Sequence, residues 1–149
     1  MNAKYFRAIL AVAALVMMTA FTVNAQGIAV KGDIPFDFIV GDTLMKAGVY
    51  TVDKHNMPGS VMMVNGYETG DRAARLINRV ERAKPAKETV LIFNRYRDNG
   101  GEVSTYLSQV WIDGMPTGFE FLKGRTEREA AARAATRDII TLVVTRIDR

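Results

Sequence analysis

The sequence lacks cysteine altogether and has a single histidine, His55, among its 149 residues. Without cysteine the protein has no disulfide framework, no cysteine-ligated zinc site and no thiol nucleophile. One histidine is too few for a three-histidine zinc centre or for a metalloprotease helix with the His-Glu-x-x-His motif. Charged residues make up 24% of the chain and hydrophobic residues 48%, a balance that favours a folded domain over a disordered chain.

Long hydrophobic runs are also scarce, and the clearest one lies close to the N-terminus. Residues 1–25 predict a cleaved secretory signal peptide, because two basic residues precede an apolar run at residues 9–21 and Val23-Asn24-Ala25 then offers the small side chains that a signal peptidase reads. The run is shorter than the about 20 residues of a typical transmembrane helix. We therefore expect an exported protein, periplasmic or extracellular, with no transmembrane helix in the mature chain.

Removing the signal peptide also removes part of the apparent basicity. The full chain carries a net charge of +4, but residues 1–25 contain two cations and no acid, so 18 Lys and Arg then face 16 Asp and Glu and the net charge is +2. A nearly neutral, exported domain is not expected to bind nucleic acid, which attracts proteins with a clear excess of Lys and Arg. Residues 26–149 are long enough to form a single β-rich domain with its own core.

The pattern of the mature chain predicts a mainly β fold. Apolar residues alternate over Ile34–Val40, as in a strand with one buried face, and turn signals such as Asn65-Gly66 separate the apolar runs. Strands are expected to begin near residues 34, 48, 60, 73, 89, 103 and 118, and a last one follows a helix. This regular spacing predicts an antiparallel barrel or sandwich of about seven or eight short strands, with one short helix before the C-terminal strand.

Two segments require a choice between helix and strand. Residues 73–82 carry arginines at helical spacing, but they lie between two hairpin-like runs, which favours a strand. Residues 126–135 predict the one clear helix, because they are rich in alanine and begin with Thr126-Glu127-Arg128-Glu129. That tetrapeptide has the form of a capping box, in which the Thr126 hydroxyl accepts a hydrogen bond from the Glu129 amide.

Several short motifs resemble an uncharacterised family of small bacterial β-rich proteins that carry signal peptides. The similarity rests on Ile34-Pro35-Phe36-Asp37-Phe38-x-Val40-Gly41, Ala47-Gly48-x-Tyr50-x-Val52, Phe93-Asn94-Arg95-Tyr96, Leu107-Ser108-Gln109-Val110-Trp111 and Arg125-x-Glu127-Arg128-Glu129. Where such proteins tend to have Leu-Pro-Ala-Gly before the second strand, this chain has Leu44-Met45-Lys46-Ala47-Gly48. The resemblance implies an exported β-rich domain over nearly the whole mature chain, and it implies no catalytic residues.

No set of residues indicates catalysis. His55 lies close in sequence to Asp53 and Ser60, but Ser60 is not part of the Gly-x-Ser-x-Gly turn that exposes a serine nucleophile. His55 also stands beside a Pro-Gly turn, where a solvated histidine is the expected state. We therefore expect that the protein is not an enzyme and uses no cofactor.

One metal hypothesis is kept as an alternative. His55 and Met57, together with Met62 and Met63, offer imidazole and thioether ligands of the kind that Cu(I) prefers. Methionine more commonly fills a core or covers a surface, so we expect no metal site.

Six aromatic residues are expected to line a ligand cavity if the fold encloses one: Phe36, Phe38, Tyr50, Phe93, Tyr106 and Trp111. Small barrels usually fill their interiors with such side chains, so a packed core is the favoured interpretation. The arginines at 72, 75, 79 and 82 are interpreted as a solvated face, with contact to an acidic polymer or a lipid head group as the alternative.

The sequence therefore predicts a small exported β domain with a non-catalytic binding or structural role. A barrel-type carrier of a small apolar ligand is the first alternative. A small outer-membrane-associated barrel is the second, although strands of about 5–8 residues are shorter than the 9–11 that span a bilayer. The sequence does not identify the partner, and a small apolar ligand or a cell-envelope component fits these expectations.

Overall fold

The computed structural model describes residues 27–54 and 60–147, and this part of the chain is mainly β. One helix lies before the C-terminal strands, as expected, and the segment 73–82 forms a strand over nearly its whole length, which confirms that choice. The expected signal peptide lies outside the described residues. In the described ranges, no helix is long and apolar enough to cross a membrane.

The described residues form eleven strands, so the expected number of seven or eight is too low. They are β1 (Ala29–Ile34), β2 (Phe38–Val40), β3 (Thr43–Met45), β4 (Gly48–Asp53), β5 (Val61–Gly66), β6 (Arg72–Glu81), β7 (Val90–Asp98), β8 (Val103–Trp111), β9 (Thr117–Phe121), β10 (Ala134–Val143) and β11 (Thr145–Ile147). The helix, α2 (Arg125–Arg133), lies between β9 and β10.

The additional strands arise where the chain bends within an apolar run. The single strand expected over residues 34–40 is divided between β1 and β2, because Pro35 has no N–H to donate to a neighbouring strand. Gly41, with a φ of 64°, then turns the chain so that β2 pairs with β3 in a short hairpin. The expected last strand is divided at Val144 into β10 and β11.

The strands form one sheet in the order β10-β7-β8-β9-β6-β5-β4-β1-β11, and each neighbouring pair in this order is antiparallel. The hairpin β2–β3 joins the side of β8 through a parallel bridge between Ile39 and Tyr106. Among the described residues β10 and β11 do not pair with each other, so the sheet does not close into a barrel. They are consecutive in the chain, with Val144 between them, and one bent C-terminal strand therefore provides both ends of the sheet.

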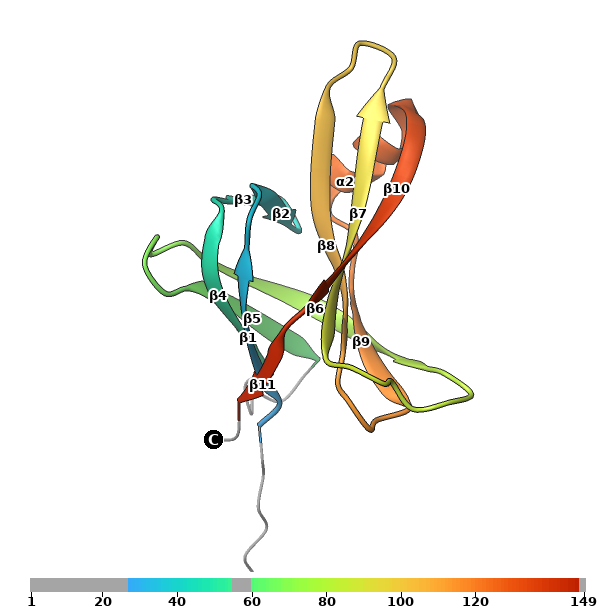
Figure 1. Cartoon of the computed structure of the whole chain (residues 1–149). Helices are drawn as coiled ribbons and strands as arrows, with labels where there is room; N and C mark the ends of the chain where they lie inside the picture. Colours follow the sequence, from blue (N-terminus) through green and yellow to red (C-terminus); the bar gives the residue numbers. More distant parts are fainter. Residues whose placement is uncertain (1–26, 55–59, 148–149) are drawn as a thin grey trace, which may run out of the picture.

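Two long stretches of chain carry the sheet around a corner. The first half of β6 pairs with β5 up to Leu76, and its second half pairs with β9 from Ile77 onward. In the same way β10 pairs with β7, and β11 pairs with β1. Figure 1 shows the result: β7, β8 and β10 form a ribbon with α2 against it, while β1, β4 and β5 form a separate group and β6 runs between the two.

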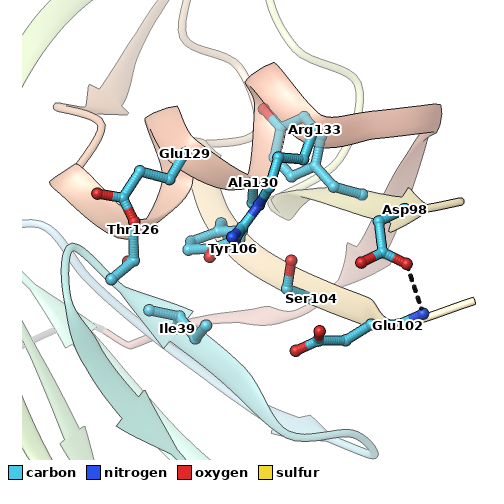
Figure 2. A pocket seen from close by; sticks show the side chains of 10 residues that line it. Ile39, Asp98, Glu102, Ser104, Tyr106, Thr126, Glu129, Ala130 and Arg133 are labelled. Atoms are coloured by element: carbon cyan, nitrogen blue, oxygen red, sulfur yellow. Dashed lines mark hydrogen bonds between the residues drawn. The ribbon is translucent and has the colours of Figure 1, made fainter. Parts of the chain in front are cut away.

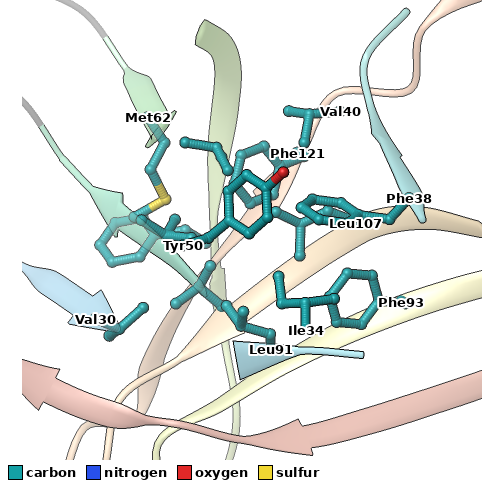
Figure 3. Close-up of a cluster of buried hydrophobic side chains, with 14 of the residues drawn as sticks. Val30, Ile34, Phe38, Val40, Tyr50, Met62, Leu91, Phe93, Leu107 and Phe121 are labelled. Carbon is teal, nitrogen blue, oxygen red and sulfur yellow. The ribbon is translucent and has the colours of Figure 1, made fainter. Parts of the chain in front are cut away.

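The hydrophobic core lies between these two groups of strands (Figure 3). Val30 and Tyr50 come from one group, and Leu91 and Phe93 come from the other; all four are at most 1% exposed. The ring of Phe38 lies edge-on to Tyr50 at 5.0 Å and to Phe93 at 5.6 Å between ring centroids. The β2 hairpin therefore contributes its aromatic side chain to the centre of the core.

The four arginines of the segment 72–82 do not share one face. Side chains of a strand alternate between its two faces, and Ala73 and Ile77 of β6 are buried. Arg75 lies on the same side as these two, and its Nε donates to the Leu122 carbonyl at 2.8 Å. Arg82 follows the end of β6, and its guanidinium stacks on the ring of Trp111. The four arginines therefore do not form one common face, which would require helical spacing, although Arg72, Arg79 and Arg82 are exposed to solvent as expected.

Candidate functional site

A half-open pocket of about 270 Å³, here termed the α2 groove, lies between α2 and the neighbouring ends of β7 and β8 (Figure 2). Its lining residues are Ile39, Tyr96, Asp98, Glu102, Ser104, Tyr106, Thr126, Glu129, Ala130 and Arg133. Three carboxyl groups and one guanidinium line this groove, together with two tyrosine rings. The groove is therefore polar and aromatic, with an excess of negative charge.

The N-terminus of α2 is held in place by a carboxylate from the β2–β3 turn. Oδ1 of Asp42 accepts a hydrogen bond from the Thr126 backbone N–H and another from the Thr126 hydroxyl, both at 3.0 Å. Gly124, the residue before the helix, allows this contact, because a side chain there would overlap the carbonyl oxygen of Gly41. Asp42 thus satisfies helix N–H groups that would otherwise lack a partner.

The predicted capping box is therefore wrong. The helix begins at Arg125, with Gly124 in the cap position and no side-chain cap there. The Thr126 hydroxyl donates to Asp42 and does not accept from Glu129. The Glu129 carboxylate instead accepts a hydrogen bond from Arg125 Nε at 2.8 Å, one helical turn away.

Substituting Asp42→Asn is expected to make the protein less sensitive to acid. The Thr126 N–H, and then its hydroxyl, hold the pKa of Asp42 below its ordinary value of 3.8. A carboxyl group with a lowered folded-state pKa stabilises the fold above the unfolded-state value, and this stabilisation is lost as the pH falls through the folded-state value. Calorimetry at about pH 7 and about pH 3 measures the fall in Tm, which should be smaller for Asp42→Asn than for the wild type.

Thr126→Val serves as a graded control for this prediction, because it removes the hydroxyl donor and keeps the backbone N–H that lowers the Asp42 pKa most. Its fall in Tm should lie between those of the wild type and Asp42→Asn. An equal fall in the wild type and in Asp42→Asn would contradict the capping role of Asp42.

Beneath α2, a second contact fixes the helix to β7. Glu127, 4% exposed, accepts hydrogen bonds at Oε1 from Asn94 Nδ2 and from the Tyr96 hydroxyl, both at 3.1 Å. Arg137 Nη2 donates to Asn94 Oδ1 at 2.9 Å, so β10 joins the same network. Burial, assisted by the nearby Glu127, raises the pKa of Tyr96 to about 12. The Tyr96 hydroxyl therefore keeps its proton at neutral pH and remains a donor.

The groove is thus bounded by elements with fixed positions. The rings of Tyr96 and Tyr106 lie edge to face, 5.8 Å apart, in its wall. Asp98 Oδ1 accepts the Glu102 backbone N–H at 2.9 Å, which closes the β7–β8 turn at its rim (Figure 2). Because α2 is attached at both Asp42 and Glu127, the shape of the groove is set before any ligand binds.

A second pocket, here termed the basic hollow, lies at the other end of β7. It has a volume of about 420 Å³. Its lining residues are Arg82, Lys84, Pro85, Ala86, Lys87, Glu88, Val90 and Thr141. The Arg82 guanidinium lies 3.7 Å from the centre of the Trp111 ring, a cation–π contact. Three cations and one acid line this hollow, so its charge is opposite to that of the α2 groove.

The structure does not bring the six predicted ligand-lining aromatics around one cavity. Phe36, Phe38, Tyr50 and Phe93 pack against one another in the core; the Phe36 and Phe93 rings are 5.2 Å apart. Trp111 belongs to a separate small cluster with Ala86 and Val90. Only Tyr106 of the six lines the α2 groove.

The predicted copper ligands lie partly outside the described residues, which exclude His55 and Met57. Met62 is buried in the core, and Met63 follows it on β5 and faces the other way. The two sulfur atoms therefore point to opposite sides of the strand. In residues 27–54 and 60–147, no group of three or more His, Asp or Glu side chains could hold a metal ion.

Two motifs of the family resemblance touch each other in the fold. Asp37 accepts hydrogen bonds from the Ala47 backbone N–H at 2.9 Å and from Lys46 Nζ at 3.0 Å, and both lower the pKa of Asp37. The Tyr50 hydroxyl donates to the Lys46 carbonyl at 2.6 Å. These residues thus have structural roles, and none of them lines either pocket.

Sequence reasoning missed Asp42, Asn94 and Glu127. Asp42 follows Gly41 as an ordinary turn residue would, and Glu127 has the same local sequence context whether it is exposed or buried. Asn94 offered a weak signal, since an amide inside a β-branched and aromatic run needs a polar partner when it is buried.

No family model, curated protein or solved structure matches this chain. The resemblance to an uncharacterised exported family stays a prediction. Function is therefore inferred from the chemistry of the two pockets.

Proposed function

We propose that this chain is an exported, non-catalytic binding protein that takes a small, positively charged ligand in the α2 groove. The observation that carries this proposal is the groove itself, a preformed pocket with two tyrosine rings and three carboxyl groups at its surface. A volume of about 270 Å³ suits a small molecule or one side chain of a partner. The surrounding sheet is taken as a sandwich whose corner strands bend between its two halves.

Charge and aromatic surface both favour a cation. Asp98, Glu102 and Glu129 outnumber Arg133, so the lining carries a formal excess of two negative charges. The rings of Tyr96 and Tyr106 line the same groove, and tyrosine rings attract ammonium and guanidinium groups; the Arg137 guanidinium already lies 6.0 Å from the centre of the Tyr96 ring. An apolar ligand would find fewer partners there, and four of the six aromatic residues expected to hold one pack together in the core.

A binding role also agrees with how the polar groups of the groove are engaged. Asp98 and Glu129 each accept a structural hydrogen bond. The raised pKa of Tyr96 keeps its hydroxyl protonated and directed at Glu127, so it is poorly suited to act as a base. Export is supported by the signal-peptide pattern of residues 1–25.

Amide NMR during titration with putrescine, a small diamine, tests the proposed ligand class. We expect shifts at groove residues such as Ser104 and Ala130, and an affinity for putrescine at least about tenfold higher than for its neutral counterpart 1,4-butanediol. Ala130→Leu, which fills the groove, should abolish these shifts. Ala132→Leu is the matched control, since Ala132 is exposed on the same helix and does not line the groove.

Equal shifts with the diamine and the diol, or shifts that persist in Ala130→Leu, would contradict the proposal. Native mass spectrometry of the protein recovered from an exporting bacterium provides a second readout. A retained cationic molecule that is lost in Ala130→Leu would identify the natural ligand class, and a retained apolar molecule would favour the carrier alternative instead.

A further inference from the structure

The strand β10 exposes two aliphatic side chains beside the basic hollow. Ile139 is 65% exposed and Val143 is 61% exposed. Thr141 lies between them on the same face of β10 and lines the hollow. In the sheet, Val143 lies opposite Val90, another residue of the hollow. Val143 therefore lies beside the basic hollow, and Ile139 continues the same face of β10 beyond Thr141.

The cationic residues of the basic hollow lie on a loop that is hydrogen-bonded to the rest of the fold. The Ala86 backbone N–H donates to the Met115 carbonyl at 3.0 Å, and its carbonyl accepts the Gly114 N–H at 2.9 Å. The Arg82 N–H donates to the Pro116 carbonyl at 2.8 Å. Ala86 is buried while its neighbours are exposed, so the loop is fixed at its centre and presents Lys84 and Lys87 to solvent.

From this juxtaposition we propose that the basic hollow and the neighbouring face of β10 form a docking surface for an anionic lipid bilayer. Arg82, Lys84 and Lys87 complement lipid phosphates, with Glu88 as the one opposing charge in the lining. Ile139 and Val143 supply apolar side chains of the kind that enter the interface between head groups and acyl chains.

The docking surface is separate from the α2 groove and does not depend on the function proposed for that groove. Val90 lies in the hollow and Asp98 lies in the groove, at opposite ends of β7. Eight residues of extended strand correspond to about 26 Å. The two surfaces also differ in the sign of their charge, so one ligand does not suit both.

Vesicle co-sedimentation tests the proposal. The protein is expressed from its full chain in an exporting bacterium, its N-terminus is determined by mass spectrometry, and it is mixed with vesicles of phosphatidylglycerol and phosphatidylcholine in equal parts or of phosphatidylcholine alone. We expect binding to the anionic vesicles only. The double variant Lys84→Gln, Lys87→Gln should weaken this binding by roughly 30-fold, from the attraction of two cations near an anionic surface.

Two matched control variants separate this surface from general effects of charge and hydrophobicity. Arg97→Gln, Lys123→Gln removes the same charge from exposed residues elsewhere and should change binding by less than about threefold. Ile139→Thr, Val143→Thr should weaken binding further, whereas Leu76→Thr, Val103→Thr, which alters exposed aliphatic residues on other strands, should not.

Three results would overturn the proposal. The first is equal binding to both kinds of vesicle. The second is an equal loss of binding in Lys84→Gln, Lys87→Gln and in its control, Arg97→Gln, Lys123→Gln. The third is complete competition by soluble glycerol phosphate. The last result would indicate a site for small anions and not for a bilayer.

Discussion

Phe93→Ala is expected to lower the free energy of unfolding by about 3–5 kcal/mol. The side chain is fully buried, and its ring contacts those of Phe36 and Phe38 at 5.2 and 5.6 Å between centroids. Its removal would leave a cavity where the two groups of strands meet. Because a domain of this size has a total stability of about 5–15 kcal/mol, urea denaturation followed by circular dichroism should detect the loss easily.

Two further variants define what this result means. Phe93→Leu keeps most of the volume and should cost less than about 1.5 kcal/mol. Tyr67→Ala removes a ring that is 73% exposed and should change stability by no more than about 0.5 kcal/mol. If Phe93→Ala cost less than about 1 kcal/mol, the ring would not be tightly packed, and an internal cavity for an apolar ligand would become the better interpretation.

Local patterns were sufficient to predict the type of most elements. In β7 and β8 the runs of β-branched and aromatic residues are long enough to distinguish strands from loops. The choice of a strand for 73–82 was correct because the segment pairs with β5 along its first half and with β9 along its second half, as its position between two hairpin-like runs indicated.

The pairing of distant segments could not be predicted in the same way. Asp42 and Thr126 are 84 residues apart, and the local sequence at Thr126 reads equally well as a capping box. The tertiary fold decides which hydrogen bond the Thr126 hydroxyl forms, because it brings the β2–β3 turn against the start of α2. The division of the last strand at Val144 is also set by the tertiary fold. The part of this apolar run before Val144 pairs with β7, and the part after it pairs with β1.

The α2 groove was missed for a related reason. Its residues come from β2, β7, the β7–β8 turn, β8 and α2, and only Tyr106 belonged to the aromatic set expected to line a cavity. The sequence marks apolar residues as inward-facing, but it does not show that a helix will cover the outer side of β7 and shelter tyrosines there. The acidic residues of the groove also look like ordinary surface and turn residues.

Glu127→Ala is expected to destabilise the protein by about 2–6 kcal/mol and to loosen α2 from β7. Glu127 Oε1 accepts from Asn94 Nδ2 and from the Tyr96 hydroxyl, and the substitution leaves both donors buried without an acceptor. Each such group costs about 1–3 kcal/mol. Urea denaturation gives the change in stability, and hydrogen exchange of the α2 amides shows whether the helix opens more readily.

Three control variants assign this loss to the buried contact. Glu127→Gln keeps an oxygen acceptor at the same place and should cost less than half as much as Glu127→Ala. Glu129→Ala, on the exposed side of the helix, should have a much smaller effect. The pair Glu127→Leu, Tyr96→Phe removes an acceptor and a donor together, so its cost should be less than the sum of the single changes. Strict additivity would mean that the Tyr96 hydroxyl does not depend on Glu127, and α2 would then be held mainly by Asp42.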